Sequence, residues 1–243
     1  MPKMDRNRQI GIGIIVFCLV SFLVLGYLGF IPFLSDLMGA NNPRNLNVKY
    51  SQSDLDSAKA KLGVKITTNP AGSSDSITIL NPSPVKTSLN SAELTAFVNY
   101  LADNWKDCPV KSLQVLINAD GTLEVSGVIL TNRFDGFANA IHLSDLSRNE
   151  LKPILSVVKS NPSFYVKCSL TVTNGAVTSS FNTIQIGRAS ISNYELALLK
   201  GYFESFIANL SKSPKNLITN LSFENGQMNL EGSFPKEITV STP

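Results

Sequence analysis

Histidine is nearly missing from the sequence, which contains one such residue, His142, among 243. No second histidine is therefore available to complete a zinc site or a proton relay between imidazole rings. The motifs of nucleotide-binding proteins, serine hydrolases and zinc proteases (GxxxxGK[ST], GxGxxG, GxSxG and HExxH) do not occur either. We therefore predict that the protein is not an enzyme and that it holds no metal and no cofactor.

Charged residues are also few, at 16% of the chain, and the net charge of +3 is spread without any basic block. Surfaces that bind nucleic acid gather Lys and Arg, so the sequence argues against a nucleic-acid partner. Asn118, Asp120 and Glu124 superficially suggest calcium, but their spacing does not match an EF-hand loop. We interpret Asp120 as a turn residue.

Uncharged residues, in contrast, form one long apolar run near the N-terminus. Ile10 to Leu34 comprises 25 residues without a charged side chain. As a helix it extends about 37 Å, enough to cross a hydrocarbon core of about 30 Å. A cleaved signal peptide is the alternative, although its apolar region is usually only about 7–15 residues long. Lys3, Arg6 and Arg8 precede the run, which predicts a cytoplasmic N-terminus.

These features predict a single-pass protein of the cell membrane whose C-terminal domain lies outside the cytoplasm. The expected parts are a cytoplasmic N-terminus (1–9), a transmembrane anchor (10–34), a linker (35–47) and an exported domain (48–243).

Cysteine is also scarce, with three residues. Cys18 lies in the apolar run, and an oxidising compartment would permit a disulfide between Cys108 and Cys168. The alternative is two separate buried thiols, because strand alternation places Cys168 on an apolar face with Leu170 and Val172.

Two stretches about a hundred residues apart have the same pattern. "ADGTLEVSG" (119–127) and "ENGQMNLEG" (224–232) each place an Asp-Gly or Asn-Gly pair before a strand pattern, which is typical of a hairpin with a type I′ turn. Asn90 with Glu93, and Ser192 with Glu195, have the spacing of a capping box, and each pair begins an amphipathic helix. A duplicated unit of helix and hairpin explains both.

The fold class predicted from these patterns is α+β. After the transmembrane helix we expect an antiparallel sheet whose apolar face is covered by amphipathic helices. Two helix-hairpin pseudo-repeats, at about 48–141 and 142–243, would share one core.

Aromatic residues gather on the two long helices and on a loop between the halves. Packing in the core explains the helical ones; an apolar groove for an acyl chain, with the loop at its mouth, is the functional alternative. The candidate residues for such an apolar ligand are Phe97, Tyr100, Leu101, Phe134, Phe137, Tyr202, Phe203 and Phe206.

A basic N-terminus, a single span, the capped helix "SLNSAELTAFVNYL" and an Asp-Gly hairpin precede "LTVTNGAVTSSFNTIQIGRASISNYELALLKGYF" (170–203). This order resembles the small membrane-anchored YpmS-like proteins of Gram-positive bacteria and, more loosely, the tubular lipid-binding domains of exported proteins. The resemblance implies an envelope location and an apolar partner. It implies no reaction.

The function that we predict from the sequence is that of a membrane-anchored, extracytoplasmic and non-enzymatic binding module for a lipid or another apolar ligand. The alternative is a structural or scaffold subunit of a membrane-associated assembly, with a protein partner in the envelope. The membrane itself would be contacted through Ile10 to Leu34.

Overall fold

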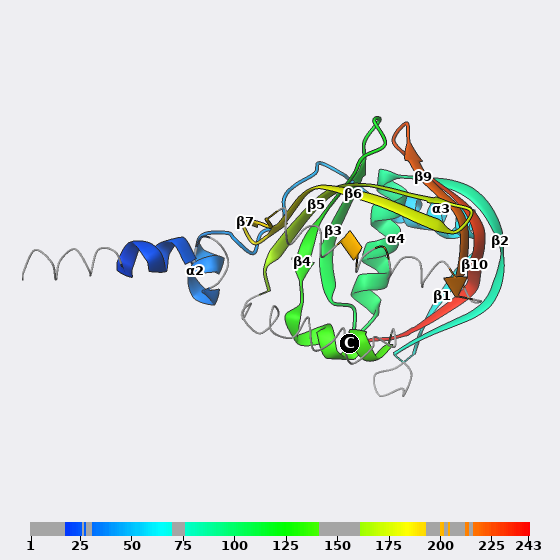
Figure 1. Cartoon of the computed structure of the whole chain (residues 1–243). Coiled ribbons are helices and arrows are strands. Elements are labelled where there is room, and N and C mark those ends of the chain that lie inside the picture. The colour runs from blue at the N-terminus through cyan, green and yellow to red at the C-terminus, as the bar shows by residue number, and fades with distance from the viewer. Residues whose placement is uncertain are drawn as a thin grey trace, which may run out of the picture.

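The structure is a computed structural model of the whole chain (Figure 1). It describes residues 18–25, 27, 31–69, 76–140, 161–192, 200–201, 204, 212–213 and 216–243.

Strands outnumber helices in the described chain. The helices are α2 (Pro32–Leu37), α3 (Gln52–Leu62), α4 (Ser91–Asn104), the short 3-10 helix η1 (Thr131–Arg133) and α5 (Phe134–Ala140). The strands are β1 (Lys65–Asn69), β2 (Ile77–Asn90), β3 (Val110–Ile117), β4 (Leu123–Ile129), β5 (Ser163–Thr173), β6 (Ala176–Ile186), β7 (Ala189–Ser190), β8 (Lys212–Ser213), β9 (Asn216–Glu224) and β10 (Gln227–Ser241).

The sheet is mixed, and the prediction of an antiparallel sheet beneath covering helices is wrong. The strand order is β1-β10-β9-β5-β4-β3, with β2 also paired to β10 and β6 to β5. Strand β1 runs parallel to β10, with Lys65 opposite Glu237. The pattern did not reveal β1 because its short sequence, "KITTN", is polar and almost wholly exposed.

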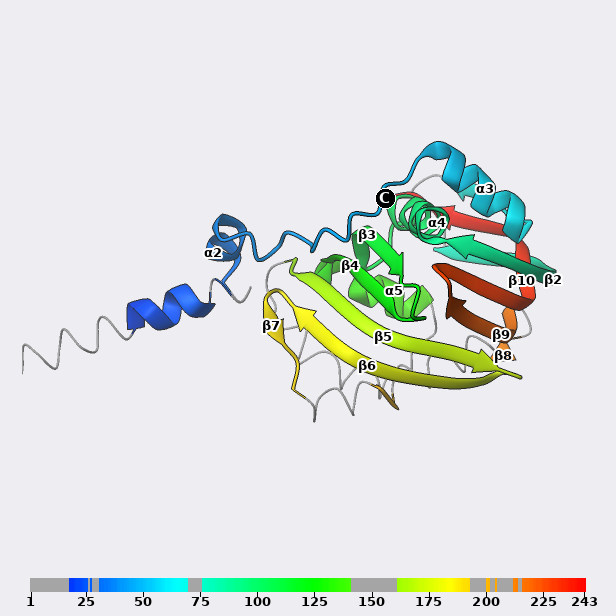
Figure 2. The ribbon, with the colours of Figure 1, turned by 90° about the horizontal axis from the view of Figure 1, so that it is seen from above.

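The sheet curls around α4 (Figure 2). Viewed from above, β3, β4, β5 and β6 lie on one side, and β9, β10 and β2 lie on the other. Helix α4 contacts β3, β10 and β2, so it closes the opening between the two arms. Apolar side chains from both arms and from α4 fill the interior, among them Leu89, Phe97, Val172, Leu221 and Leu230.

Side chains of α4 bond the free edge of β3. The Thr95 hydroxyl accepts from the Val115 N–H (3.0 Å) and donates to the Val115 carbonyl (3.2 Å). The Asn99 amide accepts from the Leu113 N–H (2.9 Å) and donates to the Leu113 carbonyl (2.7 Å). Both side chains are buried, so polar backbone groups that would face the core are satisfied.

These bonds follow one another along α4 and β3 because the residue spacing along the helix matches the spacing along the strand. Ser91 extends the series by accepting from the Ile117 N–H at 2.9 Å. Its helix members stand four residues apart, a rise of about 6 Å, and the strand residues they meet stand two apart, about 6.6 Å. The helix therefore serves as a substitute for a further strand.

The twin turns meet at one end of the molecule, where the two hairpin tips approach each other (Figure 1). A Cβ atom added to Gly121 would lie 2.6 Å from the Phe223 carbonyl oxygen, and one added to Gly226 would lie 3.8 Å from the Ile117 carbonyl oxygen. Gly121 has φ +82°, so glycine is required there for both its backbone conformation and its small size.

Prolines occupy the middle of β2. Pro82 lies opposite Pro235, and Pro84 lies opposite Ser233. A proline has no N–H to donate, so antiparallel pairing tolerates these residues where the ring nitrogen faces away from the partner strand. The nitrogens of Pro82 and Pro84 therefore face the outer edge of β2, which pairs with β10 alone among the described strands.

The predicted transmembrane anchor from Ile10 to Leu34, and with it the single-pass cell-membrane location, is contradicted. Within the described part of the chain, no helix has the length and apolar character needed to cross a membrane. Residues 18–25 are helical, but Ile31 is extended (φ −115°, ψ 106°) and a new helix begins at Pro32. The residue before a proline avoids helical geometry, which divides the run that the sequence pattern treated as continuous. Residues 1–17 lie outside the described chain.

Part of the segment expected to be a linker (35–47) is bonded to the sheet. We name residues 40–46 the strap. The Leu46 N–H donates to Gln114 Oε1 at 2.7 Å, and the Arg44 guanidinium lies 3.7 Å from the centre of the Tyr165 ring. These contacts hold the strap on β3 and β5.

Candidate functional site

The described residues proposed to hold an apolar ligand pack mostly against one another or the core. Phe97 is buried and its ring lies 6.2 Å from that of Phe234. Tyr100 is partly buried beneath the Lys59 ammonium, 3.8 Å from the ring centre. Leu101 packs on the same core.

The loop expected at the mouth of an apolar groove is helical instead, formed by η1 and α5. Phe134, the first residue of α5, is partly buried. Phe137 lies 5.7 Å from the ring of Trp105, which is buried. These positions support the alternative of core packing. The three remaining candidates, Tyr202, Phe203 and Phe206, lie outside the described residues.

Replacing Phe137 with Ala is expected to lower the free energy of unfolding by about 2–4 kcal/mol, because it leaves a hole beside Trp105. Trp105 is the single tryptophan of the chain, so its fluorescence reports unfolding in urea. Phe33→Ala is the matched control: that side chain is 77% exposed, and we expect a change within about 0.5 kcal/mol. Equal effects of the two substitutions would contradict the packing of Phe137.

The two cysteines considered for a disulfide are both free and buried. Burial raises the pKa of Cys108, and it raises the pKa of Cys168 to about 11. A thiol with a raised pKa is a poor nucleophile and a poor metal ligand near neutral pH. The structure therefore contains two separate buried thiols, which was the alternative to a disulfide.

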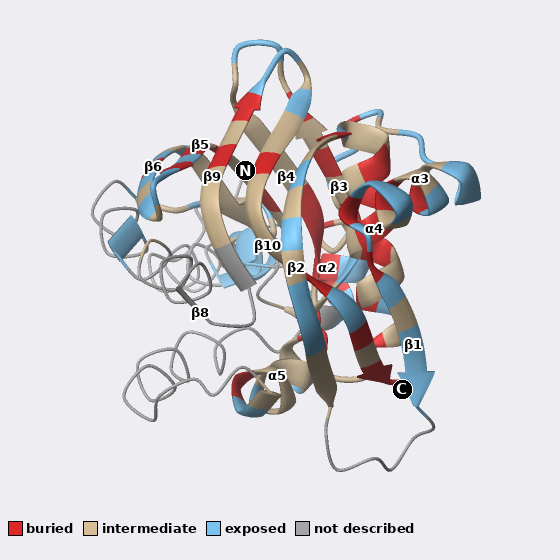
Figure 3. Ribbon diagram, turned by 90° about the vertical axis from the view of Figure 1, so that its right-hand side faces the viewer, coloured by how far each residue is buried: buried red, intermediate tan, exposed pale blue. Residues whose placement is uncertain are grey.

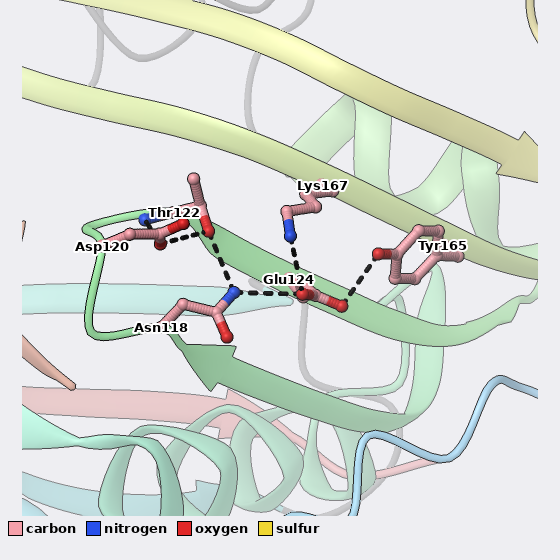
Figure 4. A network of polar contacts seen from close by, with 6 residues as sticks. All are labelled: Asn118, Asp120, Thr122, Glu124, Tyr165 and Lys167. Atoms are coloured by element: carbon pink, nitrogen blue, oxygen red, sulfur yellow. Dashed lines mark hydrogen bonds and ion pairs between the residues drawn. The ribbon is translucent and has the colours of Figure 1, made fainter.

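A polar network joins the β3–β4 hairpin to β5 (Figure 4). Glu124 is at its centre: its carboxylate accepts from the Tyr165 hydroxyl (2.8 Å), the Asn118 amide (3.0 Å) and the Lys167 ammonium (3.2 Å). Burial by itself would raise the pKa of Glu124, but these three donors outweigh it and lower that pKa. Burial and the Glu124 carboxylate together raise the pKa of Tyr165.

The polar groups of the turn before Glu124 form hydrogen bonds with one another. Asp120 accepts from the Thr122 N–H (2.9 Å) and hydroxyl (2.7 Å), and these bonds lower the pKa of Asp120. The Asn118 amide also donates to the Thr122 hydroxyl at 2.9 Å. The interpretation of Asp120 as a turn residue is confirmed. Since each carboxylate here already has short bonds within the protein, the network stabilises the hairpin and offers little to a ligand.

A second network ties α3 to the start of α4. The capping box predicted at Asn90 and Glu93 is present, with both of its bonds at 2.9 Å. Glu93 is buried and also accepts from Lys61 (2.6 Å) and Ser57 (2.5 Å). Burial by itself would raise the pKa of Glu93. The bonds from Lys61, Ser57 and the Asn90 N–H together outweigh burial, so the pKa is lowered from 4.5.

This lowered pKa predicts acid sensitivity. Because the folded state binds the Glu93 proton more weakly than the unfolded state, its contribution is complete above the ordinary pKa near 4.5 and is lost as the pH falls through the lowered folded pKa. We therefore expect Glu93→Gln to lower the urea midpoint at neutral pH. The difference from wild type should shrink below about pH 4, and a pH-independent difference would contradict this origin.

A concave surface of different character lies over the outer face of β2, β10, β9 and the end of β5, a face that is turned to the viewer in Figure 3. Two concavities, of about 600 and 590 Å³, share Lys86 and Glu231 and so form one groove. We name it the polar groove. The polar side chains that line it are Lys86, Thr87, Ser88, Thr171, Thr173, Thr219, Asn220, Ser222, Asn229, Glu231 and Ser233.

Strand register builds the polar groove. Thr173 lies opposite Asn220, Asn220 opposite Glu231, and Glu231 opposite Lys86, so one row crosses four strands. Residues of neighbouring parity, such as Leu221, point into the core. A bulge in β10 between Glu231 and Gly232 shifts the register and marks the junction of the two concavities.

The contacts of Glu231 in the polar groove are long, whereas the Asn229 amide also donates to Glu224 at 3.0 Å and the Asn220 side-chain oxygen accepts from the Asn174 N–H at 3.2 Å. Glu231 lies 3.4 Å from both Lys86 and the Asn220 amide, and the Asn229 amide lies 3.5 Å from the Ser222 hydroxyl. The Lys86 and Glu231 side chains are 81% and 46% exposed. The 3.4 Å contacts are near the limit of hydrogen-bond geometry, so Lys86 and Glu231 retain capacity for another partner.

None of the groove residues was singled out from the sequence. The alternation of polar residues along β9 and β10 is typical of any solvated strand face. No signal in the sequence could have found them, because Lys86 and Glu231 are 145 positions apart and only strand pairing places them side by side.

The chain matches no protein-family model, no curated protein and no solved structure. The resemblance to the YpmS-like family therefore stays a prediction. Among the described residues, no group of three or more His, Cys, Asp or Glu side chains is placed to hold a metal ion.

Proposed function

We propose that the protein is a non-enzymatic binding module that holds a polar ligand in the polar groove. The observation that supports this proposal is the contrast between two polar surfaces of the same sheet. Around Glu124 the bonds are short and mutual, which stabilises the hairpin. Around Glu231, in the polar groove, both contacts are 3.4 Å long, and the Lys86 and Glu231 side chains are 81% and 46% exposed.

The exchange of internal hydrogen bonds for bonds to a ligand explains why this contrast favours binding. A ligand that displaces a short internal bond forfeits about as much as it gains, whereas a weak contact at 3.4–3.5 Å is exchanged at little loss.

The test is a screen of small polar fragments by NMR on the isotope-labelled full chain. We expect fragment-induced shifts to concentrate on the amide side chains of Asn220 and Asn229. They should be lost in the double variant Asn220→Ala/Asn229→Ala. Asn132→Ala, an exposed asparagine on η1, is the matched control and should leave the shifts unchanged.

If the protein is instead a scaffold subunit, which is the predicted alternative, fragments should not shift the signals of the polar groove. If fragments shift residues elsewhere on the protein and leave the polar groove unperturbed, the proposal of a groove-based binding module is wrong.

A further inference from the structure

We infer that the ligand of the polar groove is a neutral oligosaccharide, recognised through hydrogen bonds to its hydroxyl groups. This inference rests on the proposed function, because it names the ligand class of the same groove.

The charges of the polar groove disfavour an anionic ligand. Lys86 is the one basic side chain among the residues that line the groove, and the Glu231 carboxylate lies 3.4 Å from its ammonium. Phosphate and sulfate groups are bound by clustered or bidentate cationic donors, which these lining residues do not supply. A nucleic acid would also need several such contacts.

Neutral groups dominate the remaining surface. The amides of Asn220 and Asn229 and the hydroxyl groups of Thr171, Thr173 and Ser222 each combine donor and acceptor capacity. A sugar hydroxyl has the same double capacity, so it satisfies either an amide or a carboxylate without bringing a charge. Glu231 adds two acceptor oxygens between the strands.

The large apolar side chains beneath the polar groove are out of reach of a ligand. The apolar side chains of the same strands, Val172, Leu221 and Leu230, are 2%, 8% and 6% exposed, because they point to the core. An acyl chain or a flat aromatic ligand gains affinity mainly by burying apolar side chains, and these three offer it little exposed area.

An extended peptide also fits less well. Peptides are recognised at sheet edges, in apolar grooves between helices, or against aromatic side chains. The polar groove lies on the face of four paired strands, and no aromatic side chain lines it. Three strand spacings separate its outer strands, about 14 Å, which suits a chain of sugar units laid across the strands.

The experiment is titration of the full chain with neutral hexasaccharides (cellohexaose, maltohexaose and N-acetylchitohexaose), followed by calorimetry and side-chain NMR. We expect at least one of them to bind and to shift the Asn220 and Asn229 amide signals. Asn229→Ala should weaken that binding about three- to ten-fold, the value of one lost hydrogen bond, and Asn132→Ala should not. Because the ligand is neutral, the affinity should be nearly equal at low and high salt.

Two further probes separate this inference from the proposed function. A heparin hexasaccharide or an uncharged Ser/Gly hexapeptide that shifts the groove signals, where the neutral sugars do not, overturns the oligosaccharide and leaves the binding module standing. Absence of groove shifts with all three neutral sugars overturns the inference in either case. The fragment screen then decides the proposed function by itself.

Discussion

Replacing Asn99 with Leu is expected to lower the free energy of unfolding by about 3–5 kcal/mol. The substitution removes both bonds to Leu113 and leaves its N–H and carbonyl at a buried edge. Each unsatisfied buried group costs about 1–3 kcal/mol. Urea unfolding followed by Trp105 fluorescence measures the effect.

A matched substitution on the same helix provides the control. The Asn104 amide donates within α4, to the Tyr100 carbonyl at 2.8 Å, and does not bond β3. Asn104→Leu is therefore expected to change stability by less than about 1 kcal/mol. Thr95→Val should act as Asn99→Leu does, because it leaves the Val115 backbone unpaired. If Asn99→Leu and Asn104→Leu prove equally mild, α4 does not serve the edge of β3.

Replacing Gly121 with Ala is expected to lower the free energy of unfolding by about 3 kcal/mol or more. A left-handed residue other than glycine costs about 1–2 kcal/mol by itself. At Gly121 the new methyl group would also lie 2.6 Å from the Phe223 carbonyl oxygen. Since this neighbour is backbone, relief requires the two hairpin tips to move apart.

Gly175→Ala separates the two contributions. Gly175 has φ +76°, close to the +82° of Gly121, but a Cβ there would meet nothing within 4 Å. We expect it to show the conformational cost of about 1–2 kcal/mol alone. The excess of Gly121→Ala over Gly175→Ala then measures the contact between the tips in the same unfolding assay. Equal losses would show that the tips do not touch.

Local features of the fold were predictable because neighbours in sequence determine them. Asn90 and Glu93 identify the start of α4, and Asp120-Gly121 and Asn225-Gly226 identify the two turns, since helix caps and turns depend on a few adjacent residues. The type I′ prediction fits Asn225-Gly226, where both residues have positive φ, and is wrong for Asp120-Gly121, where only the glycine does. The strand from Phe164 to Thr173 was visible in its alternation.

Features that depend on distant partners were not predictable. β2 carries two prolines and pairs with a strand more than a hundred residues away, so nothing local indicates a strand of 14 residues. The apolar run was misinterpreted because hydropathy averages over Pro32, whereas backbone geometry does not.

The candidate site divides in the same way. Phe97 follows a helical spacing that fits core packing, and the structure places it there. Phe137 was expected on a loop at the mouth of a groove, but it lies on α5 beside Trp105. The polar groove exists through register between three separate segments, so Lys86 and Glu231 carry no mutual signal in one sequence.

The prolines of β2 bear on how the protein behaves when it is crowded. Fibrils grow by adding strands, each of which bonds the unpaired amides of the one before. Without N–H groups at Pro82 and Pro84, and with Asn81 in a left-handed conformation (φ 53°), an incoming chain finds that template interrupted halfway. β2 and β10 are the longest paired strands among the described residues, and the backbone of β2 therefore disfavours the addition of another strand at its outer edge.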